Sequence, residues 1–168
     1  MTLPILTHRL RIRLLQRSDL EAIHDLFSSQ EAMKFIGPRR TMSRSETQTW
    51  LEEHLSRDSG SIHRMAVALK ETDTLIGMCG FQRMEEHWDF GTYFRREYWG
   101  QGFASEACKA VLEATPEDVE REGFKVFIAN GNTRSIQLME RLGFFKSAPA
   151  SEGQEQGHYY ERRGPETA

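Results

Sequence analysis

The sequence predicts an α/β (α+β) fold in which helices flank a mixed sheet, and three observations lead to this prediction. Short segments rich in aromatic and β-branched residues alternate with longer segments whose apolar residues recur at helical spacing. Two strand-like segments, 65–69 and 75–81, are joined by a polar turn, as in an antiparallel hairpin. Two others, 88–94 and 124–130, enclose a helix-like segment, and a unit of this length forms a right-handed parallel crossover.

Length and composition favour one domain over residues 1–168. The chain is long enough to bury one core and too short for two comfortable ones. Hydrophobic residues make up 38% and charged residues 28%, and 22 basic and 25 acidic residues leave a net charge of −3. A charge this small gives no field strong enough to argue for nucleic acid or an anionic membrane, so we expect neither partner.

The two cysteines, Cys79 and Cys108, stand in apolar surroundings. We expect both as reduced core residues, since this usage is typical of a reducing compartment and of neither a disulfide nor a metal pair. The first residues do not resemble a signal peptide, and no apolar run reaches membrane length. These features predict a cytoplasmic protein without a metal site.

The N-terminal third is expected to supply one strand and two helices. Arginines alternate with apolar residues in 9–14, which indicates a strand with one solvated face or an edge strand protected by charge. Capping boxes at 18–21 and 43–46 predict helix starts, and we expect 31–36 to prolong the first helical region. The two helices should cover one end of the sheet, and a loop is predicted at 57–60.

Within the predicted hairpin, Gly77 and Gly80 interrupt the second strand. Glycine in a strand interior indicates a bulge or a close neighbour. In the next strand, Asp89 stands among aromatic residues and has two readings. It is a solvent-facing strand residue, which we favour because buried lone carboxylates are uncommon, or a carboxylate near a reacting centre.

The C-terminal part continues the alternation. Pro116 fits the first turn of a short helix that follows the central one. Asn132 is a natural N-cap and Gly143 a natural C′ residue, so they bound a helix. A strand begins at Phe144, and we predict a polar loop at 148–157, a last strand at 158–162 and a frayed tail at 164–168.

One stretch carries chemistry: Gly100 and Gly102 stand between the strand 88–94 and the helix that follows. Free backbone N–H groups and the helix dipole favour an anion at such a point, most often a phosphate. No Gly-Lys-Ser/Thr follows, so the stretch is not a P-loop. Ser105 replaces the third glycine of the dinucleotide fingerprint, which excludes that motif as well.

Together with a second stretch, it resembles the GNAT acyltransferases, specifically the RimJ/RimL-like branch of ribosomal-protein N-acetyltransferases. Residues 97–107 (EYWGQGFASEA) match motif A, and 132–135 (NTRS) with 142–144 (LGF) match motif B. The resemblance covers about residues 8–162. Glu97 departs from the usual Gln or Arg of motif A, and the region around Pro116 is unusual.

The resemblance implies a GNAT fold: a mixed, mostly antiparallel sheet of about seven strands, flanked by about four helices, whose strands 88–94 and 124–130 splay apart. Acetyl-CoA would lie in that gap, with its diphosphate on backbone amides of motif A and its pantetheine along the strand edge. The implied cofactor-binding residues are Tyr93, Phe94, Arg95, Gly100, Gln101, Gly102, Phe103, Ala104, Ser105 and Asn132.

The implied reaction is direct attack of a neutral amine on the thioester, with a backbone N–H of 91–94 stabilising the oxyanion. By resemblance to this branch, Ser135 is the candidate hydroxyl donor that aids the leaving thiolate, or it is an ordinary first-turn serine. The general base is Asp89, Glu161 or a water chain. The acceptor, a protein N-terminus or a small-molecule amine, is not specified, and homodimer formation is left open. The rival reading is a non-catalytic acyl-CoA-binding module of the same fold.

Overall fold

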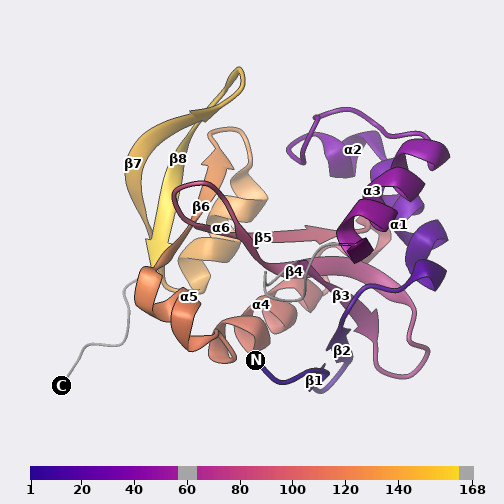
Figure 1. The fold of residues 1–168 in the computed structure, drawn as a ribbon. Coiled ribbons are helices and arrows are strands. Elements are labelled where there is room, and N and C mark those ends of the chain that lie inside the picture. Colours follow the sequence, from indigo (N-terminus) through magenta and orange to yellow (C-terminus); the bar gives the residue numbers. More distant parts are fainter. Residues whose placement is uncertain (57–63, 163–168) are drawn as a thin grey trace.

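The computed structural model describes residues 1–56 and 64–162, which form one eight-stranded sheet with helices on both faces (Figure 1). The strand order is β1-β2-β3-β4-β5-β6-β8-β7, and every neighbouring pair is antiparallel except β5 and β6. The strands are β1 (Ile5–Leu6), β2 (Leu10–Arg13), β3 (Arg64–Leu69), β4 (Leu75–Arg83), β5 (Trp88–Phe94), β6 (Phe124–Ala129), β7 (Phe144–Glu152) and β8 (Glu155–Arg162).

Six α-helices and two 3-10 turns connect the strands in the described residues. The α-helices are α1 (Leu20–Phe27), α2 (Gln30–Met33), α3 (Arg44–Ser56), α4 (Phe103–Glu113), α5 (Glu117–Glu122) and α6 (Thr133–Arg141), and the 3-10 turns are η1 (Arg17–Asp19) and η2 (Arg96–Tyr98). The predicted mixed, mostly antiparallel sheet is confirmed. The described chain has eight strands and six α-helices, against about seven and about four predicted, and β1, α2 and α5 are the shortest of these elements. The loop predicted at 57–60 and the tail at 164–168 lie outside the described residues.

Two apolar layers hold the helices on the sheet. Side chains alternate between the faces of a strand, so successive residues of β3 enter different layers. Ala66 packs with residues of α1, α2 and α3, whereas Met65 and Val67 pack with residues of α4 and α6. The predicted N-terminal helices therefore cover one face of the sheet, and the crossover helix α4 covers the other.

The predicted hairpin is formed by β3 and β4. A close neighbour and a bulge, the two features expected from its glycines, both occur near Gly77. A Cβ atom there would lie 2.4 Å from the Tyr93 carbonyl oxygen and 2.7 Å from the Phe94 ring, so only glycine fits beside β5. The register between β3 and β4 also shifts at Val67 and Ala68, opposite this position.

The polar loop predicted at 148–157 is wrong, because most of it is strand. β7 and β8 form a long hairpin that turns at Gly153, whose φ is +58°. β7 is the edge strand of the sheet, and most of its residues are exposed or half-buried. An edge strand tolerates polar residues and proline such as Pro149, so composition alone suggested a loop.

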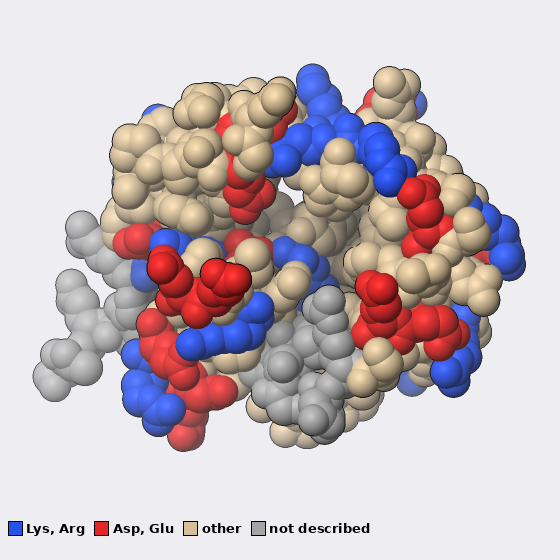
Figure 2. All heavy atoms as spheres, turned by 45° about the horizontal axis from the view of Figure 1, so that its top comes forward, with Lys and Arg blue, Asp and Glu red and all other residues tan. Residues whose placement is uncertain are grey.

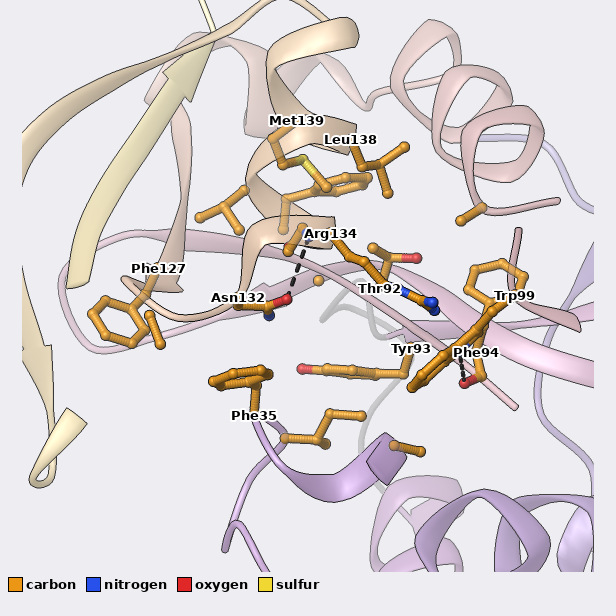
Figure 3. Close-up of a pocket in the computed structure, with 18 of the residues that line it drawn as sticks. Phe35, Thr92, Tyr93, Phe94, Trp99, Phe127, Asn132, Arg134, Leu138 and Met139 are labelled. Carbon is orange, nitrogen blue, oxygen red and sulfur yellow. Dashed lines mark hydrogen bonds between the residues drawn. The ribbon is translucent and has the colours of Figure 1, made fainter. Parts of the chain in front are cut away.

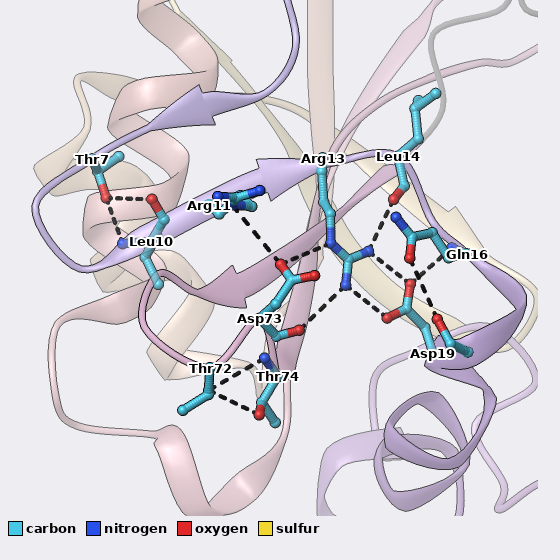
Figure 4. Close-up of polar contacts among 11 residues, drawn as sticks. Thr7, Leu10, Arg11, Arg13, Leu14, Gln16, Asp19, Thr72, Asp73 and Thr74 are labelled. Carbon is cyan, nitrogen blue, oxygen red and sulfur yellow. Dashed lines mark hydrogen bonds and ion pairs between the residues drawn. The ribbon is translucent and has the colours of Figure 1, made fainter.

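The solvated arginine face predicted for 9–14 is also wrong in part, since Arg13 is buried and Leu14 is 67% exposed. The Arg13 guanidinium donates to both carboxylate oxygens of Asp19 at 2.9 Å and to Asp73 at 3.1 Å (Figure 4). Hydrogen bonds to Asp19 raise the pKa of Arg13, although its burial acts in the opposite sense. A buried arginine with this many charged partners ties β2 to the start of α1.

Of the two predicted capping boxes, one is formed. At α3, the Ser43 N–H donates to Glu46 at 2.7 Å and the Glu46 N–H donates to the Ser43 hydroxyl at 3.2 Å. At α1, the predicted box with Ser18 is absent, because Asp19 instead accepts from the Gln16 N–H at 2.8 Å while it pairs with Arg13. The ion pair therefore determines how this helix begins.

The Arg13–Asp19 pair yields a stability prediction. Asp19→Ala leaves the buried guanidinium with only part of its partners and should lower the free energy of unfolding by about 3 kcal/mol or more, measured by urea denaturation. Glu52→Ala, which breaks the exposed pair with Arg17, is the control and should change stability little. Equal effects of the two substitutions would show that burial does not strengthen the Asp19 contact.

Candidate active site

The central feature of the site is the parting of β5 and β6. Their ladder contains two residue pairs, Trp88 with Phe124 and Asp89 with Lys125, and in the described chain no further pair joins them. Beyond this point the strands diverge around a cavity of about 910 Å³. Figure 2 shows the molecule hollowed between its two halves. Figure 3 shows side chains from the β5 side and from the β6–α6 side around the cavity.

The glycine stretch forms a tight loop at one wall of this cavity. Gly100 and Gly102 have φ of +74° and +82°, a left-handed backbone that glycine adopts without strain. Gly102 is the N-cap of α4, and no side chain caps the first turn of this helix. Gly100, Gly102 and Phe103–Ser105 line the cavity. The unsatisfied N–H groups of an uncapped first turn favour an anion here.

The N-terminal segment braces this loop. Glu106 of α4 accepts hydrogen bonds from the Thr7 hydroxyl at 2.6 Å, the Arg9 N–H at 2.9 Å and Arg9 Nε at 2.7 Å. Burial alone would raise the pKa of Glu106, but these hydrogen bonds lower it overall. Arg9 also donates to the Gln101 carbonyl at 3.0 Å and stacks over the Phe103 ring at 4.2 Å. Sequence analysis missed this brace, since its residues are nearly 100 positions apart.

Most of the residues expected to bind the cofactor line the cavity. They are Tyr93, Phe94, Gly100, Gly102, Phe103, Ala104, Ser105 and Asn132. Two others are directed elsewhere. The Arg95 guanidinium pairs with Asp25 at 2.9 Å, and the Arg95 backbone N–H donates to the Ile76 carbonyl. The Gln101 side chain donates to the Glu97 carbonyl at 2.8 Å, outside the cavity wall.

The start of α6 forms the opposite wall. Asn132 caps this helix, because its side-chain oxygen accepts the Ser135 N–H at 3.3 Å. The Asn132 amide NH₂ is left to donate to a ligand. Ser135 is half-buried and lines the cavity with Asn132. The candidate hydroxyl and the candidate amide therefore lie on the same turn.

Asp89 lies at the point where β5 and β6 separate, and the solvent-facing reading is wrong. Its side chain is 18% exposed and accepts from Arg64 of β3 at 2.7 Å. Arg64 also donates to Gln82 at 2.5 Å and lies over the Tyr93 ring at 4.6 Å. All four residues line the cavity. Together they form a polar cluster at its closed end.

A glycine makes room for Arg64 in this cluster. Asp89, Gly91 and Tyr93 occupy alternate positions of β5 and therefore share one face of the strand. A Cβ atom on Gly91 would lie 2.4 Å from Arg64 Nε. In the register, Gly80 of β4 lies between Arg64 and Gly91. The guanidinium can thus cross β4 and rest on β5 only where no side chain intervenes.

Burial perturbs the acidic groups of this cluster. Burial raises the pKa of Asp89, and the Arg64 charge counteracts that rise. Burial also raises the pKa of Tyr93 to about 12, which keeps its phenol neutral at ordinary pH. Glu152 of β7 lines the same cavity, and its pKa is raised by burial and by the Asp89 charge. Perturbed titratable groups around one cavity are typical of functional sites.

The other carboxylate considered as a base, Glu161, is placed elsewhere. Glu161 of β8 accepts from the Ser147 hydroxyl at 3.2 Å, between the strands of the C-terminal hairpin. The cavity wall instead includes Phe35, Trp99 and Arg134, which sequence analysis did not select. Trp99 and Arg134 stand inside the two motifs, so proximity to the glycines and to Asn132 is the signal that could have found them. For Phe35 no such signal exists.

No metal centre or membrane span is found in the part of the chain that the structure describes. Residues 1–56 and 64–162 contain no group of three or more His, Cys, Asp or Glu side chains arranged to hold a metal ion. Within the same ranges, no helix has the length and apolar character needed to cross a bilayer. Cys79 and Cys108 are buried free thiols whose sulfurs lie 3.8 Å apart, as expected for core cysteines.

Comparison with known proteins places the chain among acetyltransferases. Residues 9–145 match the family model described as "Acetyltransferase (GNAT) domain". An uncharacterized N-acetyltransferase of Bacillus licheniformis, p20, is 29% identical over 145 residues, which cover 83% of this chain and 81% of p20.

Two similar solved structures contain coenzyme A. One is RimL, a ribosomal α-N-protein acetyltransferase, with a TM-score of 0.76, 17% identity and coverage of 95% of this chain and 96% of that one. The other is a spermidine N-acetyltransferase from Vibrio cholerae, crystallised with coenzyme A and spermine. Its TM-score is 0.72 at 20% identity, with coverage of 92% of this chain and 95% of that one. At these identities the similarity establishes a shared fold.

The Arg64 contact predicts how Asp89 titrates. Arg64→Met removes the cation that favours the ionised carboxylate, so the pKa of Asp89 should rise further and protonation should begin at higher pH. The carboxyl carbon-13 chemical shift of Asp89, followed with pH, measures this effect. Arg64→Lys retains the charge and serves as the control. Superimposable titrations of Arg64→Met and the wild type would mean that Arg64 does not control this carboxyl.

Proposed function

This chain belongs to the GNAT acetyltransferase family, and from that premise we propose that it transfers an acetyl group from acetyl-CoA to a primary amine. Donor and acceptor would react directly in a ternary complex. The observation that carries the proposal is the cavity between β5 and β6, which has the uncapped turn of α4 at one wall and the Asp89 cluster at its closed end. We further propose a RimJ/RimL-like, cytoplasmic enzyme.

The residues present fit coenzyme A, which supplies the acetyl group as a thioester. The N–H groups of residues 100–105 would hold the diphosphate, since this turn is uncapped and its glycines allow close approach. The edge of β5 near Tyr93 and Phe94 would hold the pantetheine arm, because the ladder with β6 has ended there. The free NH₂ of Asn132 would donate to this arm from the α6 side.

At the reacting end, a backbone N–H of the 91–94 segment would stabilise the negative charge that develops on the thioester carbonyl oxygen. Ser135 would donate a hydrogen bond from its hydroxyl to the departing thiolate. This leaving group needs modest help, since an ordinary thiol has a pKa of about 8.5. Ser135 suits this role because its hydroxyl lines the cavity on the turn that carries Asn132.

Asp89 is the favoured base for removing a proton from the incoming ammonium group. It lies at the closed end of the cavity, whereas Glu161 hydrogen-bonds Ser147 in the C-terminal hairpin. Burial raises the pKa of Asp89, and the Arg64 contact counteracts this rise by favouring the anionic carboxylate. Proton removal through water would suit a carboxylate whose oxygen is already engaged by a guanidinium.

For the acceptor, we propose an amine on a chain that is narrow enough to enter this cavity. RimL is a ribosomal-protein acetyltransferase and the Vibrio cholerae enzyme a spermidine acetyltransferase, so the shared fold accommodates both peptide and polyamine acceptors. Either class satisfies the proposed chemistry, because each presents a primary amine.

An acceptor screen tests the proposed function. Purified protein with acetyl-CoA should release free thiol when at least one of three amine classes is added: peptides with different N-termini, polyamines or aminoglycosides. Calorimetry with coenzyme A runs in parallel. Binding without thiol release for every amine would favour the rival acyl-CoA-binding module, and absence of binding would reject the cofactor assignment.

Gly102→Asp should abolish coenzyme A binding, measured by calorimetry. The substitution strains a backbone with φ of +82° and places a carboxylate at the start of α4, where the diphosphate would lie. Gly123→Asp is the matched control, since Gly123 has φ of +79°, open space around it and a position outside the cavity wall. A folded Gly102→Asp variant with wild-type affinity would count decisively against this loop.

Ser135→Ala should lower kcat by about 10²-fold with little change in coenzyme A affinity, because the lost hydroxyl acts on the leaving thiolate. Thr133→Ala, on the same turn but outside the cavity wall, is the control and should retain activity. Steady-state kinetics with the best acceptor from the screen measure both variants. Wild-type turnover after Ser135→Ala would remove this hydroxyl from the mechanism.

A further inference from the structure

Arg134 joins the two walls of the cavity. It stands on the first turn of α6, and its guanidinium lies 4.4 Å from the centroid of the Trp99 ring (Figure 3). Trp99 belongs to the other wall, directly before Gly100, and its indole N–H donates to the Phe94 carbonyl at 2.8 Å. The indole is therefore held against β5, and the long arginine side chain reaches it across the cavity.

The charge of Arg134 is uncompensated. In residues 1–56 and 64–162, no ion pair joins Arg134 to a carboxylate, whereas Arg64, which lines the same cavity, pairs with Asp89. The ring partner of Arg134, Trp99, stands three residues before Gly102, the N-cap of α4, and this helix start carries the positive end of a helix dipole. An anion bound there would neutralise both.

Stacking orients the guanidinium for such an anion. The guanidinium carbon lies over the indole ring, and the N–H donors of a guanidinium lie in the plane of the group and point away from its edges. Arg134 can therefore keep the Trp99 contact and donate two parallel hydrogen bonds to phosphate oxygens at the same time. A lysine would lose both the stack and the paired donors.

We propose that Arg134, oriented by Trp99, binds the diphosphate of coenzyme A from the α6 side and so selects the nucleotide-bearing thioester over shorter thioesters. This assignment rests on the proposed function, because it requires coenzyme A in the cavity. Residues 100–105 would hold one side of the diphosphate and Arg134 the other. Trp99 contacts the anion only through Arg134 and is a positioning residue.

The test uses calorimetry to compare the affinities of the intact protein for two ligands. Coenzyme A carries the diphosphate, and pantetheine has the same thiol arm without the nucleotide. Arg134→Ala should weaken coenzyme A binding about tenfold or more, as expected for charge-assisted hydrogen bonds, and should leave pantetheine binding unchanged. Arg134→Lys should be intermediate. Arg121→Ala, which removes an exposed charge of α5 outside the cavity wall, should leave both affinities unchanged.

A double-variant cycle tests the role of Trp99. Trp99→Leu removes the platform and should weaken coenzyme A binding in the wild-type background. If Trp99 acts through Arg134, adding Trp99→Leu to Arg134→Ala should cause little further loss. Thermal melting of each variant verifies that the fold is retained, as expected for the exposed Arg134.

The outcomes separate this assignment from the proposed function. Wild-type protein that binds no coenzyme A overturns both. Normal wild-type binding with unchanged affinity after Arg134→Ala overturns only the Arg134 assignment. Equal losses of affinity for coenzyme A and pantetheine after Arg134→Ala would also overturn it. The arginine would then support binding of the pantetheine arm and not of the diphosphate.

Discussion

The parting of β5 and β6 is the constraint on which the rest of the structure depends. Beside the paired ends of β5 and β6, the rings of Phe90, Phe124 and Phe144 pack with centroids 6.0–6.2 Å apart and hold the strands together. After the second residue pair the ladder ends, so in the described chain the backbone groups that β5 and β6 turn toward each other have no strand partner. Buried peptide groups require hydrogen bonds, and an extended ligand with amides, such as pantetheine, can supply them. The same divergence that opens the cavity thus defines what fits in it.

The divergence also brings two helix starts together. α4 follows β5 and α6 follows β6, so their first turns reach the same cavity from opposite walls. The two turns differ in how their N–H groups are used. Asn132 caps α6, whereas α4 begins at Gly102 without a side-chain cap. The dipole of α4 therefore remains available to an anion, while α6 presents side chains, and under the proposed function this asymmetry would put the phosphates at the α4 wall and side-chain donors at the α6 wall.

Sequence could predict the glycine loop before α4 and the cap of α6, because each depends on residues that are close together in the chain. Gly100, Gly102 and Asn132 act through turns and caps, which depend on near neighbours in the chain. Arg64 could not be predicted, since its contact with Asp89 depends on the register of three strands and on Gly91 lying beneath it. Asp89 looked solvent-facing for the same reason: a lone carboxylate among aromatic residues gives no sign of a partner 25 positions away.

One side of the cavity is formed by segments that the two motifs do not contain. The Phe35 ring lies 3.7 Å from where a Cβ of Gly131 would be, and Arg39 pairs with Glu152 of β7 at 3.6 Å. The segment after α2 thus meets both the β6–α6 loop and the C-terminal hairpin over the cavity. Arg39 holds a φ of +55°, a strained conformation for a non-glycine residue. These contacts involve none of the residues proposed to bind coenzyme A, so a substitution among them can reshape this side of the cavity without touching those residues.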